Sequence, residues 1–168
     1  MNPAEIRDIQ GMVARRGVHI CVGIPVLMLL AALLLRKYFG FLADPIAAPN
    51  NLEVLGIAFL GVSAVDLAAA YLLKRRLLNP KQLKARWVAQ PAEFGENLAD
   101  AYVPVFVVAA APALYGLIFY FLGGDLDTYV LISVFCPAGL LLLRPRDQEV
   151  ERLVAEILGV PRRSKDDE

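Results

Sequence analysis

Long apolar runs separated by short polar segments form the pattern of this chain. The runs lie at about residues 18–38, 53–75, 102–123 and 127–144. A helix rises about 1.5 Å per residue, so about 20 apolar residues cross a hydrocarbon layer about 30 Å thick. Each run approaches that length. The pattern therefore predicts an all-α integral membrane protein with one membrane domain over residues 1–168, folded as a four-helix transmembrane bundle.

Two shorter segments have amphipathic patterns. Near the N-terminus, Ile6, Ile9 and Val13 share one helical face, which predicts a short helix lying on the inner leaflet. Near the C-terminus, residues 146–159 predict a second amphipathic helix. Its apolar stripe consists of Val150, Leu153, Val154, Ile157 and Leu158. This stripe can pack on its own bundle, bind a partner or lie on lipid, and its acidic opposite face makes anionic lipid the weakest of the three.

Composition agrees with the membrane class and argues against several functions. Hydrophobic residues make up 58% of the 168 residues, and the mean hydropathy is +0.54. The four runs leave no room for a soluble catalytic domain, so we expect no enzyme activity and no cofactor. The net charge is zero, which gives no indication of a nucleic-acid partner.

Positive charge is distributed unevenly between the two ends of the predicted bundle. The end of the second run and the loop after it hold Lys74, Arg75, Arg76, Lys81, Lys84 and Arg86. The turn between the third and fourth runs holds Asp125 and Asp127 instead. Cytoplasmic loops carry an excess of lysine and arginine. The loop at residues 76–101 and both termini should therefore be cytoplasmic, with a bacterial inner membrane as the default location. The two acids suit helix N-termini.

The polar parts also offer candidate surfaces for a partner or for lipid. Trp87, beside Arg86 in the basic loop, can anchor at the membrane interface as an amphipathic aromatic residue. Leu153 and Ile157 of the C-terminal stripe are the other candidates. If the protein recruits anything from the cytoplasm, these are the residues that we expect to contact it.

Asp66 is a lone carboxylate near the middle of the second run. A charged carboxylate at the centre of a span costs about 2.5–3.5 kcal/mol on insertion, so it should face the bundle. Ser63 lies one turn away, and the hydroxyls of Tyr115 and Ser133 lie at compatible depths. These groups can form a structural hydrogen-bonded network. Alternatively, Asp66, Ser63 and Tyr115 form an intramembrane proton or cation site.

Small residues mark faces on which helices can approach closely. The second run has such a face at Gly61, Ala64 and Ala68, and the third run has one at Ala109, Ala113 and Gly116. We expect these two runs to form an antiparallel hairpin through the basic loop. Their small faces should then pack against each other or against a neighbouring subunit.

Prolines and cysteines occur inside the apolar runs. Prolines at positions 25, 104, 112 and 137 each remove a backbone hydrogen bond and tend to kink a helix, which a bundle tolerates. Cys21 and Cys136 have no spacing motif, so we interpret them as buried small residues. His19 and Cys21 point to different helical faces, so we expect no metal site.

One stretch resembles a known family. Residues Gln90-Pro91-Ala92-Glu93, followed by Pro112-Ala113-Leu114-Tyr115-Gly116-Leu117-Ile118, are similar to the loop and second helix of rotary-ATPase proteolipid subunits of the c or K type. The resemblance covers about 70 of the 168 residues and implies an ion-handling membrane ring. In that family the ion-carrying carboxylate precedes the tyrosine-glycine pair by five residues. That position here is Ala110. Either the carboxylate role passes to Asp66 on the neighbouring run, or the chain keeps the helix packing of that family without the ion.

Two functions follow as hypotheses. The first is a non-catalytic multi-pass membrane protein that contacts the lipid bilayer and serves as a structural or accessory subunit of a homo- or hetero-oligomeric complex. The second is a proton- or cation-handling, proteolipid-like subunit that uses Asp66.

Overall fold

The computed structural model describes residues 3–39, 49–81, 83–84 and 94–158, and these residues form helices joined by short connections. Four segments are long and apolar enough to cross a membrane, namely Glu5–Leu35, Asn51–Leu77, Gly95–Phe121 and Leu126–Leu143. An all-helical fold with four segments of spanning length is therefore confirmed.

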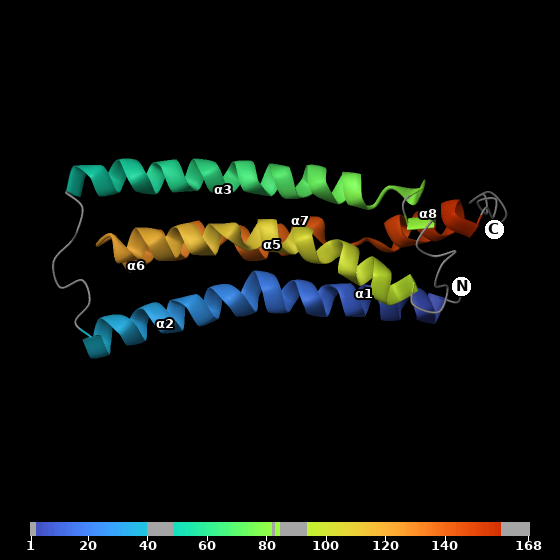
Figure 1. Ribbon diagram of the computed structural model, residues 1–168, viewed down its shortest axis with the longest axis horizontal. Coiled ribbons are helices and arrows are strands. Elements are labelled where there is room, and N and C mark those ends of the chain that lie inside the picture. The colour runs from blue at the N-terminus through green and yellow to red at the C-terminus, as the bar shows by residue number, and fades with distance from the viewer. Residues whose placement is uncertain (1–2, 40–48, 82, 85–93, 159–168) are drawn as a thin grey trace.

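In chain order the helices are α1 (Pro3–Val18), the π-helix η1 (His19–Gly23), α2 (Ile24–Phe39), α3 (Pro49–Leu77), α5 (Phe94–Phe121), α6 (Leu126–Ser133), α7 (Phe135–Leu143) and α8 (Asp147–Leu158). They form four passages that lie side by side and alternate in direction (Figure 1). The first passage is α1 to α2, the second is α3, the third is α5, and the fourth is α6 with α7. We refer to the end where α1 begins and α8 lies as the α8 end. The opposite end, where α5 turns into α6, is the turn end.

Helix α5 forms the centre of the bundle. Half of the residues in its most apolar stretch are buried. In the corresponding stretches of the α1–α2 passage and of α3, 17% of the residues are buried. Val105, Phe106, Ala109 and Ala113 are almost inaccessible to solvent. The three other passages therefore surround α5, and their outer faces remain exposed.

Helix α3 packs on α5 through a regular row of residues. Members of this row are alternately four and three positions apart, which is the spacing of a left-handed coiled-coil seam. They are Leu52, Gly56, Phe59, Ser63, Asp66, Ala70, Leu73 and Leu77, all buried or partly buried. The antiparallel pairing of the second and third spans is thus confirmed, with Asp66 in the contact row.

The predicted small face of α3 is not the one that packs on α5. Gly61, Ala64 and Ala68 are exposed on the side turned away from the row, and a Cβ at Gly61 would meet nothing within 4 Å. Contact between the two small faces within one chain was therefore a wrong prediction. Helix α3 has small residues on two faces, and its polar Asp66 and Lys74 decide which one turns inward, because both need partners there.

The small face of α5 packs on the fourth passage instead. A Cβ at Gly116 would lie 3.1 Å from the carbonyl oxygen of Tyr129 on α6. Nearby, a Cβ at Gly139 on α7 would lie 3.0 Å from the Cβ of Ala109. These small residues bring α5 close to the backbones of α6 and α7.

The expected separate surface helix at the N-terminus was also a wrong prediction. Helix α1 continues through η1 into α2 as one rod, and Ile9 and Val13 are buried in the bundle. The apolar periodicity was right, but the protein itself covers this face. Periodicity reveals that a face is apolar without revealing what packs on it.

Two prolines account for irregular turns in the outer passages. The amide of Ile24 donates to the carbonyl of His19 across the π-helix, one residue before Pro25, which has no amide proton to donate. The fourth passage is interrupted at Val134, three residues before Pro137. In contrast, α5 remains one helix through Pro104 and Pro112.

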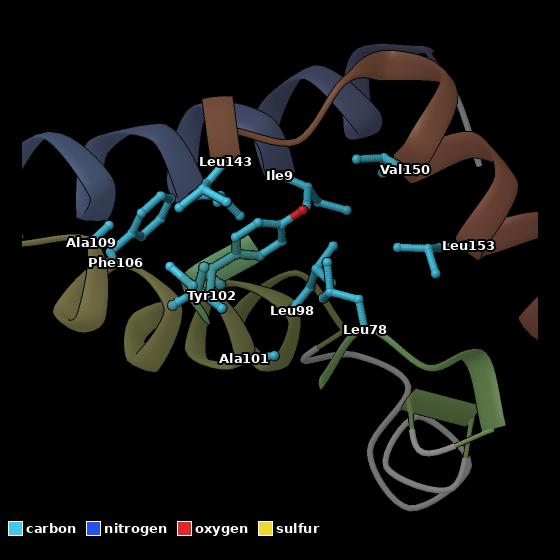
Figure 2. Packing of buried hydrophobic residues seen from close by; sticks show 14 of the residues in the cluster. Ile9, Leu78, Leu98, Ala101, Tyr102, Phe106, Ala109, Leu143, Val150 and Leu153 are labelled. Atoms are coloured by element: carbon cyan, nitrogen blue, oxygen red, sulfur yellow. The ribbon is translucent and has the colours of Figure 1, made fainter. Parts of the chain in front are cut away.

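At the α8 end, the C-terminal helix packs onto the bundle. The predicted helix at residues 146–159 is confirmed as α8. Figure 2 shows Val150 and Leu153 of α8 facing the cluster that contains Ile9 and Leu98. Leu153 is 7% exposed and Ile157 is 5% exposed, so their prediction as a free partner or lipid surface was wrong. Hydrophobic burial stabilises α8 on its own protein.

The loop between the second and third spans is shorter than predicted. Helix α5 begins at Phe94 rather than near residue 102, and Leu98 and Ala99 within its first turns are completely buried. The charged residues Glu96 and Asp100 led to the prediction of a loop here, but they lie only on the exposed side of the helix. Arg86 and Trp87 lie outside the described residues.

Candidate functional site

Asp66 and Tyr115 form a hydrogen-bonded pair between α3 and α5. The Tyr115 hydroxyl donates to Oδ2 of Asp66 at 2.7 Å. Asp66 precedes Leu77, the last residue of α3, by 11 positions, or about 16 Å along the helix. The pair therefore lies deep within the apolar length of the bundle.

The Tyr115 ring is held in place by Phe59. Their ring centroids are 5.7 Å apart and their planes are inclined by 13°, which is a stacked arrangement. Phe59 lies two turns before Asp66 on α3, so one helix supplies both the platform and the acceptor. Asp66 and Tyr115 are each partly exposed, and the pair is therefore at the edge of the α3–α5 contact.

The other predicted hydroxyls do not join this pair. The buried Ser63 donates to the carbonyl of Phe59 at 2.7 Å, one turn back on the same helix. Ser133 has a buried Oγ with no hydrogen-bond partner in the described part of the chain. A serine hydroxyl in a helix readily binds the carbonyl four residues earlier, so sequence proximity of Ser63 to Asp66 gave a misleading prediction.

The chemistry of the pair is that of a carboxyl group and a phenol without a cation. Among the described ion pairs, none includes Asp66. Nor does any group of three or more histidine, cysteine, aspartate or glutamate side chains gather within the described residues. The pair can fix the packing of α3 on α5, and its carboxyl group can bind or release a proton.

Lys74 forms a second polar contact, which the sequence did not reveal. Its Nζ donates to Oε2 of Glu149 on α8 at 2.7 Å and lies 5.6 Å from the centroid of the Tyr102 ring. Lys74 is only 7% exposed. A buried ammonium requires such partners, so this contact fixes α8 relative to α3.

A further ion pair joins α1 to α5 at the same end. Arg16 donates to Oδ1 of Asp100, and both side chains are partly or largely exposed. An exposed pair contributes little to stability. It nevertheless places an arginine and a carboxylate together between α1 and α5.

Asp125 caps α6 at the turn end. Its Oδ1 accepts from the amide of Thr128 at 2.7 Å, and its Oδ2 accepts from the Thr128 hydroxyl at 2.9 Å. The hydrogen bond that the backbone amide of Thr128 donates is the main cause that lowers the pKa of Asp125 below its ordinary value. The preceding Gly123 has φ of 103°, which a glycine adopts without strain. The predicted helix-start role of Asp125 is confirmed.

Both cysteines are buried free thiols, as their interpretation as small core residues predicts. Cys21 lies 3.6 Å from the carbonyl oxygen of Phe106, and Cys136 lies 3.6 Å from that of Ala110. Each thiol donates weakly to α5. Their role is therefore to pack the first and fourth passages on the central helix.

No protein-family model, curated protein or solved structure matches this chain. The resemblance to rotary-ATPase proteolipid subunits remains a hypothesis. Ala110, at the position that carries the carboxylate in that family, is buried in α5. The functional argument therefore rests on the contacts of this chain alone.

Proposed function

We propose that this chain is a multi-pass membrane protein that acts as a non-catalytic structural or accessory subunit of an oligomeric complex. Its four span-length segments cross the bilayer with the α8 end in the cytoplasm. The distribution of charge supports this orientation, because Lys74, Arg75 and Arg76 end α3 at the α8 end, whereas Asp125 and Asp127 lie at the turn end. In bacteria the inner membrane is the expected location.

The observation that carries the proposal is the outward face of α3. Gly61, Ala64 and Ala68 are exposed along one side of the helix while the opposite side packs on α5. Among the flanking residues, Ile57 is 66% exposed and Val65 is 67% exposed. A lipid-facing helix has no need of small residues, but a close helix neighbour does, because they let two backbones approach. We infer that a helix of another subunit, identical or different, packs there.

The experiment is a mass measurement on protein purified in a gentle detergent. The wild type is expected to have the mass of an oligomer or of a complex with another subunit. The double variant Ala64→Leu, Ala68→Leu adds bulk to the outward face and should reduce the particle to a single chain. Because both positions are exposed, the fold of each chain should survive the change.

Ala31→Leu is the matched control. Ala31 is also an exposed alanine in an apolar helix, but it lies on α2, away from the face in question. This variant should retain the wild-type mass. A wild type that is a single chain under the mildest conditions, or a double variant that assembles normally, would contradict the proposal.

A second function is favoured by Asp66 itself. The carboxyl group is partly exposed deep in the apolar layer and has a phenol as hydrogen-bond donor rather than a cation. Such a group suits a proton- or cation-handling subunit. In that case Asp66→Asn should abolish proton flux in reconstituted vesicles, and a hydrophobic carbodiimide should label Asp66 in a pH-dependent manner. Flux that persists unchanged in Asp66→Asn would exclude this role.

A further inference from the structure

An open cavity of about 470 Å³ lies at the α8 end, between α1 and the link that joins α7 to α8. The residues that line it are Arg7, Gln10, Gly11, Ala14, Arg144, Pro145 and Arg146. Those on α1 are spaced as one helical face. A Cβ at Gly11 would meet nothing within 4 Å, so the backbone of α1 forms an open floor.

The lining is strongly basic. It includes three arginines, and none of the described residues that line it is acidic. Arg7 already has an interaction within the chain, so the side chains of Arg144 and Arg146 carry the argument. Both are exposed, and the described part of the chain shows no ion pair for either. The guanidinium fork of arginine matches the oxygen atoms of a phosphate group.

The link between α7 and α8 is fixed at both sides of the cavity, because Arg144 donates its amide to Leu140 and the carbonyl of Arg146 accepts from Val150. The two arginines are therefore attached to an ordered backbone.

The position of the cavity relative to the span-length segments indicates the source of the anion. Arg144 directly follows Leu143, the last residue of the fourth span-length segment, and Arg146 is two residues further on. In the proposed orientation this is the headgroup level of the inner leaflet. Basic pockets between helices on the cytoplasmic side bind the headgroups of anionic lipids.

We propose that this cavity binds the phosphate of an anionic phospholipid headgroup, held by Arg144 and Arg146 above the open floor at Gly11. This inference rests on the proposed membrane insertion. It adds a lipid-binding site that the bundle architecture alone does not require. The bound lipid would join α1 to the base of α8.

The test uses the full chain in nanodiscs of phosphatidylcholine with or without phosphatidylglycerol. Native mass spectrometry counts the phosphatidylglycerol molecules that stay bound, and a lipid titration gives the apparent Kd. An arginine near a charged membrane surface changes affinity about fivefold. Arg144→Gln with Arg146→Gln should therefore weaken retention about 25-fold, the product of the two.

Two further variants separate the site from general charge. Gly11→Leu fills the floor without changing any charge and should also abolish selective retention. Arg152→Gln removes one positive charge from an exposed position on α8 and should retain the lipid like the wild type. The proposal is overturned if Arg144→Gln with Arg146→Gln and Gly11→Leu retain the lipid normally, or if Arg152→Gln loses it equally.

A soluble anion is distinguished in the same experiment. Inorganic phosphate added to the phosphatidylcholine nanodiscs should bind far more weakly than the lipid, and equal binding would overturn the lipid assignment. Failure of the chain to enter nanodiscs would contradict membrane insertion and the proposed function. Entry without any preference for phosphatidylglycerol would contradict the lipid site alone.

Discussion

Lys74 on α3 and Glu149 on α8 are joined by a 2.7 Å ion pair, although they are 75 residues apart in the chain. Glu149→Gln would leave the buried ammonium without an anionic partner. We expect a loss of about 2 kcal/mol in the free energy of unfolding, because a hydrogen bond to a charged group contributes about that amount. Denaturant titration in detergent measures it, with limited proteolysis after α8 as a second readout.

The control for this pair is Glu151→Gln, which removes the same charge from an exposed position on α8. Its effect should stay within about 0.5 kcal/mol. Replacing both partners, with Lys74→Met and Glu149→Leu, should recover much of the loss because no buried charge remains. Equal effects of Glu149→Gln and Glu151→Gln would show that the ion pair does not hold α8.

The hydrogen bond from Tyr115 to Asp66 gives a second prediction. Tyr115→Phe keeps the ring stacked on Phe59 but removes the donor, and should cost about 1 kcal/mol of folding free energy. Asp66→Asn should cost less, since an amide oxygen still accepts from the phenol. Tyr71→Phe is the control, because Tyr71 is 45% exposed on α3, the helix that carries Asp66. If both tyrosine variants behave alike, the pair has no structural role.

The cap of α6 gives a pH-dependent prediction. Asp125→Ala removes both bonds to Thr128 and should destabilise the protein by about 1 kcal/mol at neutral pH. Because folding lowers the pKa of Asp125, its contribution is complete above the unfolded value near 4 and is lost as the pH falls through the folded value. The difference between wild type and Asp125→Ala should therefore shrink on acidification. Asp127→Ala, in the same turn, should show no comparable difference at neutral pH.

Gly116 and Gly61 should respond to alanine with opposite signs. At Gly116 the added Cβ would lie 3.1 Å from the Tyr129 carbonyl, which belongs to the backbone, so we expect a loss of about 1–3 kcal/mol. At Gly61 the Cβ meets nothing, so the higher helix propensity of alanine should leave stability unchanged or raise it by up to about 1 kcal/mol. Unfolding of both variants is compared in a detergent that separates the subunits, so that only contacts within one chain contribute. A destabilising Gly61→Ala would show that the face is occupied within the chain.

The sequence predicted the four long apolar helices and α8 because their residue patterns are local. Four spans need only length and apolarity, and the stripe around Val150 and Ile157 needs only helical periodicity. The pairing of Asp66 with Tyr115 could also be predicted, because a mid-span carboxylate requires a donor and the two spans were expected to be neighbours.

It was harder to predict which helix packs on a given face and which charged side chains form ion pairs. The stripe at Gly61, Ala64 and Ala68 and the row at Gly56, Ser63 and Ala70 both suit close packing, and only three-dimensional contacts decide between them. In the sequence, Lys74 could not be distinguished from the exposed basic residues beside it. Its partner Glu149 is 75 residues away, and no local pattern indicates that the two side chains meet. The cavity beside Arg144 likewise depends on how α1 passes the α7–α8 link.

The most direct test of the account is the sidedness of single cysteines in vesicles. In a chain that lacks Cys21 and Cys136, Lys84→Cys reports the α8 end and Asp127→Cys reports the turn end, both from exposed positions. A membrane-impermeant maleimide should label Lys84→Cys only from the cytoplasmic side and Asp127→Cys only from the opposite side. Labelling of both positions from the same side, or recovery of the protein in detergent-free buffer, would contradict a bundle that crosses the bilayer four times.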